Sequence, residues 1–314
     1  DIFQICSRSK FTPFNLASFY CAIKQGLLSD QESKVLGCTL LNTSWLFSCG
    51  LPDSRTLIPF YIRSIERYLN HPASSPVQTS LRQACYEILA KILSMTNRFS
   101  TAKFPVDGPS IGDFFIQPHI TSFVDLEPHF GYILTTALNN ETNSLNLTSL
   151  LHLGYVFVFE YLPYSTFSST TTQGTLVLQV ASRFIGTFQQ IILRQIPTWP
   201  TEVSLVALEI LSDLTNLYRF IDKREKSAAF TVTRLCDLLS NRSDDSLALA
   251  MYRCMTYWLM VDTWAAKEQD VFNRSVEVAL SDLISPVTGA PSSSASSTSS
   301  TIPSSTGSTR AAGS

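Results

Sequence analysis

The sequence predicts an all-α fold, an α-solenoid built from irregular HEAT- or armadillo-like helix pairs. Two observations lead to this prediction. Apolar side chains recur at helical spacing through most of the 314 residues, and Pro, Gly, Asn and Ser separate these segments at short intervals. Hydrophobic residues make up 45% of the chain and charged residues only 15%, so we expect a large core and some exposed apolar surface that contacts another segment or subunit.

Four helices are predicted before residue 100: 15–28, 31–48, 55–69 and 78–95. Asn15 can cap the first of them, because its side-chain oxygen can accept a hydrogen bond from a free backbone N–H of the first turn. Pro59 fits only in the opening turn of the third, where its missing N–H has no acceptor within the helix. The third and fourth helices have the clearest apolar faces: Ile58, Tyr61, Ile62, Ile65 and Leu69, then Leu81, Cys85, Ile88, Leu89, Ile92 and Leu93.

A loop that contains Pro and Gly is predicted from about 97 to 126, followed by helices at 127–139, 145–161 and 175–196. Within these, YVFVFEYL (155–162) is rich in residues that favour β-strands. We nevertheless predict a helix there, because the neighbouring segments are helical and a single strand would have no pairing partner.

The pattern is clearest between 201 and 284. Thr201 and Glu202 open a helix that carries Leu205, Leu208, Leu211 and Leu214, and further helices are predicted at 227–240, 246–262 and 269–284. Trp258 should anchor the apolar face of the 246–262 helix. Asp244 and Asp245 lie at the start of that helix, where the helix dipole favours negative charge, so they need no catalytic explanation.

The helical pattern and a change of composition near residue 286 divide the chain into two regions. Residues 1–285 form the predicted helical region, which the loop at 97–126 allows to be divided into two lobes. Residues 286–314 are rich in Ser and Thr and hold almost no apolar residues, so we predict a disordered linker. An alternative role for this tail is regulation by phosphorylation.

Charge and cysteine usage restrict the partners and the compartment. The net charge is -2 and the 23 basic residues are scattered, which argues against nucleic acid or an anionic membrane surface as the main partner. No apolar run reaches the roughly 20 residues of a membrane-spanning helix, and no signal peptide is expected after Asp1. The seven cysteines form no CxxC pair, so we expect mostly buried free thiols in the cytoplasm.

No catalytic, cofactor-binding or metal-binding residue is predicted. His119 and His129 flank Asp125 and Glu127, but this segment contains two prolines and lacks the spacing of HExxH. The nucleophile motif GxSxG and the phosphate-binding motifs GxxxxGK[ST] and GxGxxG are absent. His152 lies in an apolar segment and is expected in the core.

The turn before DKREK leaves two interpretations open. Tyr218, Arg219 and Phe220 there could form an exposed recognition patch, or they could simply be the end of a helix.

Four segments resemble a known family: SCGLPDSRTLIPFYIRSIERYL (48–69), LRQACYEILAKILSMTNRF (81–99), VALEILSDLTNLYRFIDKREKSAAFTVTRLCDLL (206–239) and LALAMYRCMTYWLMV (247–261). They resemble the helical region of the large subunits of Ral GTPase-activating protein complexes, relatives of tuberin, and the β subunit is the most similar. These segments are packing patterns and not catalytic motifs.

The resemblance implies a cytoplasmic heterodimer that accelerates GTP hydrolysis by Ral-type small GTPases. In that family a separate domain carries the catalytic Asn, and no residue of this chain matches it. The resemblance therefore implies a non-catalytic scaffold that contacts a partner subunit and, through the complex, the GTPase. The alternative is an unrelated α-solenoid adaptor that binds peptides or helices in trafficking or signalling.

Overall fold

The structure is a computed structural model that describes residues 16–29, 34–48, 51, 54–72, 75–99, 123–161, 172–220, 227–240, 245–261 and 269–284. Within these ranges every regular element is helical and no strand occurs, which confirms the all-α prediction. The predicted cap residue Asn15 and the Ser/Thr-rich segment 286–314 lie outside the described residues.

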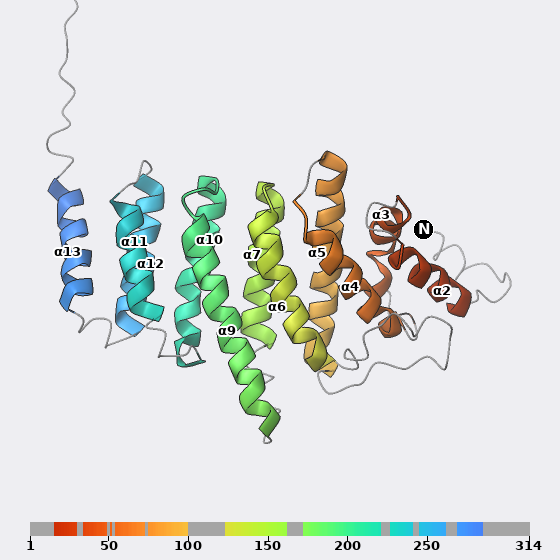
Figure 1. The fold of residues 1–314 in the computed structure, drawn as a ribbon. Coiled ribbons are helices and arrows are strands. Elements are labelled where there is room, and N and C mark those ends of the chain that lie inside the picture. Colours follow the sequence, from red (N-terminus) through yellow and green to blue (C-terminus); the bar gives the residue numbers. More distant parts are fainter. Residues whose placement is uncertain are drawn as a thin grey trace, which may run out of the picture.

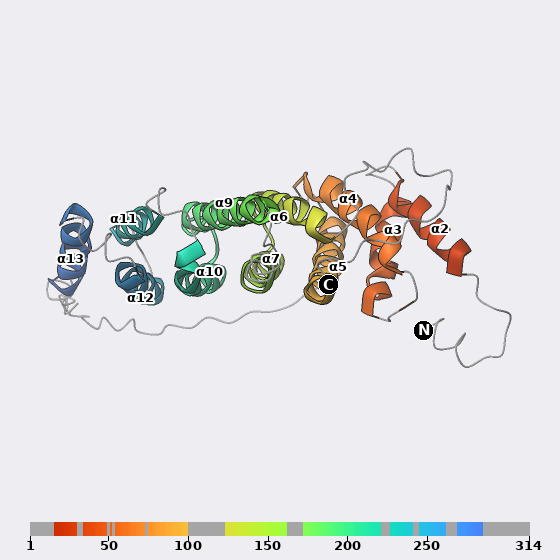
Figure 2. The same cartoon turned by 90° about the horizontal axis from the view of Figure 1, so that it is seen from below.

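The helices form two layers that run side by side along an elongated molecule (Figures 1 and 2). One layer consists of α4 (Ile58–Leu69), α6 (Phe123–Asn140), α9 (Thr172–Gln195) and α11 (Ser227–Leu239). The other consists of α5 (Pro76–Phe99), α7 (Ser144–Val156), α10 (Thr201–Asp213) and α12 (Asp245–Val261). The pair α2 (Leu16–Leu27) and α3 (Lys34–Thr43) precedes them, and α13 (Gln269–Ile284) follows them.

Each helix packs on its pair partner and on the equivalent helix of the next pair. In the first layer α4 contacts α6, α6 contacts α9, α9 contacts α11, and α11 contacts α13. In the second layer α5 contacts α7, α7 contacts α10, and α10 contacts α12. Such contacts between neighbouring pairs define a solenoid, so this prediction is also confirmed. Helices before and after residues 100–122 pack on one another in both layers.

Several helix boundaries differ from those expected. Helix α5 extends to Phe99 and α6 begins at Phe123, so the predicted loop at 97–126 is shorter at both ends. Pro128 therefore lies inside α6 and not in its opening turn. Pro59 lies in the first turn of α4, as predicted. The described residues also include the short 3-10 segments η1 (Leu46–Ser48), η2 (Ser54–Leu57) and η5 (Leu214–Phe220).

The segment rich in β-forming residues is helical, as predicted. Helix α7 starts at its N-cap Asn143, whose side chain accepts a hydrogen bond from the Asn146 backbone N–H at 3.1 Å. It continues beyond Val156 as a π-helical turn, η4 (Phe157–Tyr161). Gly154 permits close contact with α9, because a Cβ atom at this position would lie 2.6 Å from Cζ of Phe188.

Every residue of the apolar faces predicted for α4 and α5 is buried, whereas Leu205 of the face predicted for α10 is only half-buried. Trp258 is also buried, as expected, and its indole N–H donates a hydrogen bond to the Leu211 carbonyl at 3.0 Å.

The burial prediction for His152 was wrong, and the prediction of buried thiols holds for three of the five described cysteines. His152 is exposed: α7 buries Leu147, Leu150, Leu151 and Gly154, and position 152 lies on the opposite side of the helix. The thiols of Cys21 and Cys38 are exposed as well, because α2 and α3 turn these positions away from the core. Cys85, Cys236 and Cys254 are buried free thiols, as predicted, whereas Cys6 and Cys49 lie outside the described residues.

Candidate functional site

One buried polar cluster lies between α5 and the turn that joins α6 to α7, and it is centred on Glu141. The Arg82 Nε donates to Glu141 Oε2 at 2.8 Å, and both side chains are almost fully buried. The remaining donors to this carboxylate are the Tyr86 hydroxyl, the Asn146 amide and the backbone N–H groups of Thr142 and Asn143.

These donors decide the charge state of the cluster. Burial alone would raise the pKa of Glu141, but the hydrogen bonds from Arg82 and Tyr86 outweigh burial and lower that pKa. A second nitrogen of Arg82 donates to the His71 carbonyl at 2.7 Å, so the cluster also fixes the loop between α4 and α5. Because the carboxylate is so well paired, the cluster is structural and leaves little capacity for a ligand.

Two neighbouring cavities lie along the layer that contains α6, α9 and α11, and they are together called the groove. They share the lining residues Thr135 and Thr187, and their volumes are about 290 Å³ and about 700 Å³. The smaller cavity is lined by Glu127, Pro128, Gly131, Tyr132, Thr135, Phe157, Arg183, Phe184 and Thr187. The larger one is lined by Thr135, Asn139, Thr187, Gln190, Ile191, Leu193, Arg194, Phe230, Arg234 and Asp237. The groove thus extends across three helices of this layer.

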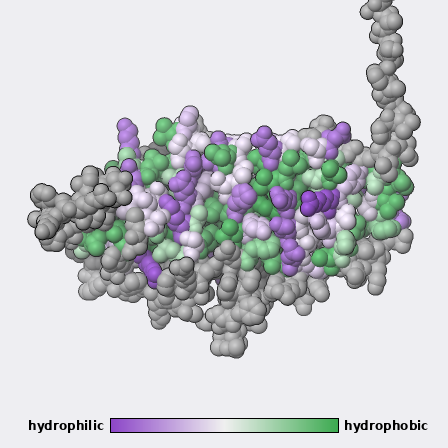
Figure 3. Space-filling model, turned by 180° about the vertical axis from the view of Figure 1, so that it is seen from behind, coloured by the Kyte–Doolittle hydropathy of each residue, from purple (hydrophilic) through white to green (hydrophobic). Residues whose placement is uncertain are grey.

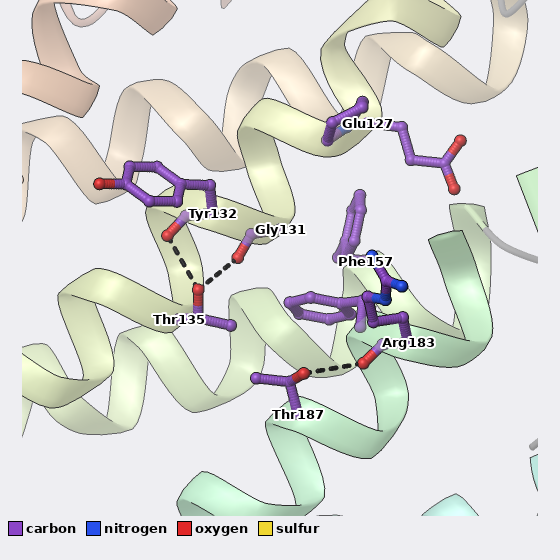
Figure 4. A pocket seen from close by; sticks show the side chains of 9 residues that line it. Glu127, Gly131, Tyr132, Thr135, Phe157, Arg183 and Thr187 are labelled. Atoms are coloured by element: carbon purple, nitrogen blue, oxygen red, sulfur yellow. Dashed lines mark hydrogen bonds between the residues drawn. The ribbon is translucent and has the colours of Figure 1, made fainter. Parts of the chain in front are cut away.

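The floor of the smaller cavity is mostly apolar. The rings of Phe157 and Phe184 meet edge to face with centroids 4.8 Å apart. The two shared threonines turn their hydroxyls to their own helices: Thr135 donates to the Gly131 and Tyr132 carbonyls, and Thr187 donates to the Arg183 carbonyl (Figure 4). Their methyl groups and the aromatic rings therefore provide most of the remaining surface.

Glu127 is the exceptional residue of this cavity. Its side chain is only 3% exposed, and its Oε1 has no hydrogen-bond partner in the described part of the chain. Burial raises the pKa of this carboxyl from 4.5 to about 7. Figure 4 shows the Glu127 side chain and the Arg183 guanidinium beside the Phe157 ring, and no ion pair joins the two charged groups.

The larger cavity has a more polar lining than the smaller one. An Arg194 nitrogen donates to Asn139 Oδ1 at 2.5 Å, and an Arg234 nitrogen lies 4.0 Å from Asp237 Oδ2. Asp237 also pairs with Arg274 of α13. Each cavity therefore carries both acidic and basic side chains, and those of the larger one are paired with each other or with neighbouring polar groups.

The three described histidines, His71, His129 and His152, do not gather into a site. His129 Nδ1 lies 3.0 Å from Glu66 Oε2, which links α6 to α4. His119 lies outside the described residues, and Asp125 lies in the first turn of α6. Within the described ranges, no group of three or more His, Cys, Asp and Glu side chains could hold a metal ion.

The predicted recognition patch at 218–220 is only partly described. Tyr218 is half-buried and its ring meets that of Trp258 edge to face, with centroids 6.2 Å apart. The side chains of Arg219 and Phe220 lie outside the described residues. Tyr218 thus contributes to the packing between η5 and α12, as the helix-end interpretation expects.

Sequence reasoning predicted no site residue at Glu127 and missed the groove. The available signal was the pair of large aromatic residues, Tyr132 and Phe230, at helix positions outside the apolar stripes; both are about half exposed. Such residues mark binding surfaces more often than scattered polar residues do.

The opposite face, formed by the second layer, is mixed in character (Figure 3). On α12, Leu249 and Met260 are among its most exposed apolar side chains. The Arg253 guanidinium lies 5.8 Å from the Tyr257 ring centroid between them. Among the described helices, none is both long and apolar enough for a bilayer crossing.

The fold and its groove define an α-solenoid with a candidate docking surface. The chain is homologous to a Rap-GAP domain-containing protein of Dictyostelium discoideum, with 30% identity over 300 residues that cover 84% of this chain and 18% of that protein. It also matches the human Ral GTPase-activating protein subunit beta, with 30% identity over 159 residues that cover 46% of this chain and 11% of that subunit.

These matches confirm the resemblance at the level of GTPase-activator-related proteins. The chain spans about a fifth of the length of the first relative and about a tenth of the second. No protein-family model matches the chain, and no solved structure matches it.

Proposed function

We propose that this chain is a non-catalytic scaffold region of a Ral-type small-GTPase-activating protein complex in the cytoplasm. The observation that carries the proposal is the homology of 84% of the chain to a Rap-GAP domain-containing protein. The matched residues fold as stacked helix pairs, which is an architecture that presents long surfaces to other proteins. Its role in the complex would be to support subunit assembly and, through it, GTP hydrolysis by the GTPase.

Exposed apolar surface supports an assembly role. On α13, Phe272, Val276 and Leu280 repeat every four residues and are each at least 39% exposed. Contiguous exposed apolar residues on one helix face are typical of a contact with another protein segment. We propose that residues 1–285 act as one helical region in this assembly, with 286–314 as a linker.

The test is capture of a defined partner. The full chain, carrying a tag, is mixed with the purified α subunit of a Ral GTPase-activating complex, and the bound fraction is measured. The proposal expects stoichiometric capture of that subunit. In a parallel assay the chain alone should leave the rate of GTP hydrolysis by Ral unchanged. No capture, or an increased rate with the chain alone, would overturn the scaffold role.

The groove favours a second candidate, a peptide-binding adaptor. Two neighbouring cavities beside exposed aromatic residues suit an extended or helical peptide. Affinity capture with mass spectrometry separates the two candidates, because recovery of transport or coat proteins without any GTPase regulator would favour the adaptor.

A further inference from the structure

We propose that the outer face of α13 binds an amphipathic helix of a partner protein, one that carries Lys or Arg beside its apolar stripe. The proposal deepens the proposed function and rests on it, because the partner subunit of the complex is the protein that would supply this helix. The outer face is defined by Phe272, Val276 and Leu280, with Asp270 and Glu277 beside them.

The position of α13 in the array is the first argument. It is the last of the described helices, and it packs mainly on α11 (Figures 1 and 2). Its side chains Val271, Ser275 and Val278 face the array. In the same layer, α6, α9 and α11 each have a neighbour on both sides. Among the described helices, α13 therefore differs from them in having a neighbour on one side only.

The outer face of α13 is apolar, as in a contact between two helices. Phe272, Val276 and Leu280 are four residues apart, so they form one ridge about 12 Å long. These side chains are 39% to 51% exposed. The terminal unit of a solenoid normally presents a polar outer face to water. Helix α13 instead presents a ridge of the kind that packs into the groove between side chains of another helix.

A helix fits this face better than an extended segment or a membrane. An extended segment needs a sheet edge for its backbone N–H and C=O groups, and no strand occurs among the described residues. A helix pairs these groups internally and would continue the packing that already joins α11 to α13. An anionic membrane would place lipid headgroups beside Asp270 and Glu277, which carry the same charge.

The acidic side chains beside the ridge determine the charge of the partner helix. Glu277 lies three residues before Leu280 and is therefore next to it, and Asp270 lies seven residues before Glu277 on the same side. Both are exposed, and neither forms an ion pair within the described part of the chain. Arg274 of α13 pairs with Asp237 of α11. Lys or Arg on the partner helix would complement the remaining negative charge and fix the register of the contact.

A second copy of this chain lacks that complementarity. Two α13 helices packed antiparallel about a twofold axis at Val276 would place Phe272 of one copy on Leu280 of the other. The same arrangement would place Glu277 of one copy beside Glu277 of the other, and like charges at a contact disfavour it.

The experiment is selection of displayed helical peptides, randomised along one face, on the full chain and on the variants L280E and L145E. Leu145 of α7 is the matched control, because it is also an exposed leucine and lies far from α13 (Figure 1). We expect peptides selected on the wild type and on L145E to combine an apolar stripe with Lys or Arg beside it. The best peptide should bind L280E at least about tenfold more weakly. Equal binding to L280E, or no peptide selected on the wild type, would overturn the proposal.

E277K tests the charge of the contact and leaves the apolar ridge unchanged. Its control is E87K, which reverses an exposed carboxylate on α5. The selected basic peptide should bind E277K about threefold more weakly than it binds E87K at low salt. Equal binding to the two variants would overturn the proposal. A thermal melt of each variant identifies any loss of folding, and E277K remains a valid test if L280E unfolds.

Sedimentation velocity distinguishes a partner helix from a second copy. The proposal expects the wild type and L280E to sediment alike. A wild-type dimer that L280E dissociates and L145E retains would assign this face to a second copy and overturn the proposal.

Capture of the α subunit keeps this inference separate from the proposed function. Capture by both the wild type and L280E leaves the scaffold role intact and contradicts the contact through α13. Loss of capture with L280E but not with L145E supports both. If neither the wild type nor L280E captures the subunit, the scaffold role fails, and the peptide selection still decides whether this face binds a basic amphipathic helix.

Discussion

The two buried carboxylates at opposite ends of α6 have opposite surroundings. Glu141 accepts hydrogen bonds from Arg82, Tyr86, Asn146 and two backbone N–H groups, and these partners lower its pKa. Glu127 has no donor to Oε1, and burial raises its pKa to about 7. Similar burial of the same chemical group is therefore accompanied by pKa shifts of opposite direction, because several hydrogen-bond donors surround Glu141 and none reaches Oε1 of Glu127.

This contrast separates a carboxylate that stabilises the fold, Glu141, from one whose charge destabilises it, Glu127. A carboxylate that already has all of its donors fixes the chain around it, and removing it should damage the fold. A carboxylate with an unpaired buried oxygen destabilises the folded chain when it is ionised, and removing its charge should raise stability. The three predictions below test this distinction, from the largest effect to the smallest.

The substitution E141Q should give the largest loss of stability. It leaves the Arg82 guanidinium buried without its counter-charge, which typically costs about 3–5 kcal/mol. Urea unfolding near neutral pH measures this loss, and E202Q, an exposed carboxylate, should differ from the wild type by less than about 0.5 kcal/mol.

The pH dependence gives a second check on E141Q. Because the folded-state pKa of Glu141 is lowered, its contribution is present above the unfolded value of 4.5 and is lost as the pH falls through the lowered value. The gap between E141Q and the wild type should therefore close in acid. A variant as stable as the wild type at neutral pH would contradict the structural role.

The substitution E127Q should change stability in the opposite direction and stabilise the fold. The folded-state pKa of Glu127 is raised from 4.5 to about 7, so the ionised group destabilises the folded state as the pH rises through this range. The shift corresponds to at most about 3 kcal/mol. Near pH 8, E127Q should therefore be more stable than the wild type by up to about that amount.

Most of this difference should develop between about pH 5 and pH 8, and comparison of the two proteins cancels the titration of all other groups. Thermal melts across this range measure it. A constant difference across the range, or a less stable E127Q near pH 8, would show that Glu127 has donors in solution.

Two glycines differ in how much room the neighbouring helix leaves for an added methyl group. G154A should cost about 1–3 kcal/mol, because its Cβ would lie 2.6 Å from the fully buried Phe188. In G131A the new Cβ would lie 3.1 Å from Cδ2 of Phe184, which lines the smaller cavity and can shift into it. We therefore expect G131A to cost less than about 1 kcal/mol. Denaturant unfolding of the two variants measures the difference.

Much of the fold could be predicted from the sequence because the core helices repeat their apolar residues with a clear period. The stripe from Ile58 to Leu69 on α4 is an example, and all of its predicted members are buried. The prediction for His152 was wrong because leucines occupy nearly all sides of α7, so periodicity could not determine which side faces the core. The start of α6 was also misplaced, because Pro128 normally belongs in the first turn of a helix.

The candidate site could not be predicted, because its residues come together only through stacking of distant helices. Glu127 and Phe184 are far apart in sequence, and they share a cavity only because α6 packs on α9. The burial of Glu127 likewise depends on this packing. The spacing of the histidines around Glu127 argued against a metal motif, and only the tertiary structure places this carboxylate in a cavity lined by aromatic rings.

The terminal position of α13 has a consequence for local unfolding. This helix packs mainly on α11, with a further hydrogen bond from the Tyr252 hydroxyl of α12 to the Val278 carbonyl. Opening of α13 would expose little of the remaining array, because each helix of a solenoid is supported by its immediate neighbours. Its backbone amides should therefore exchange with deuterium long before those of α10, which lies between neighbours on both sides.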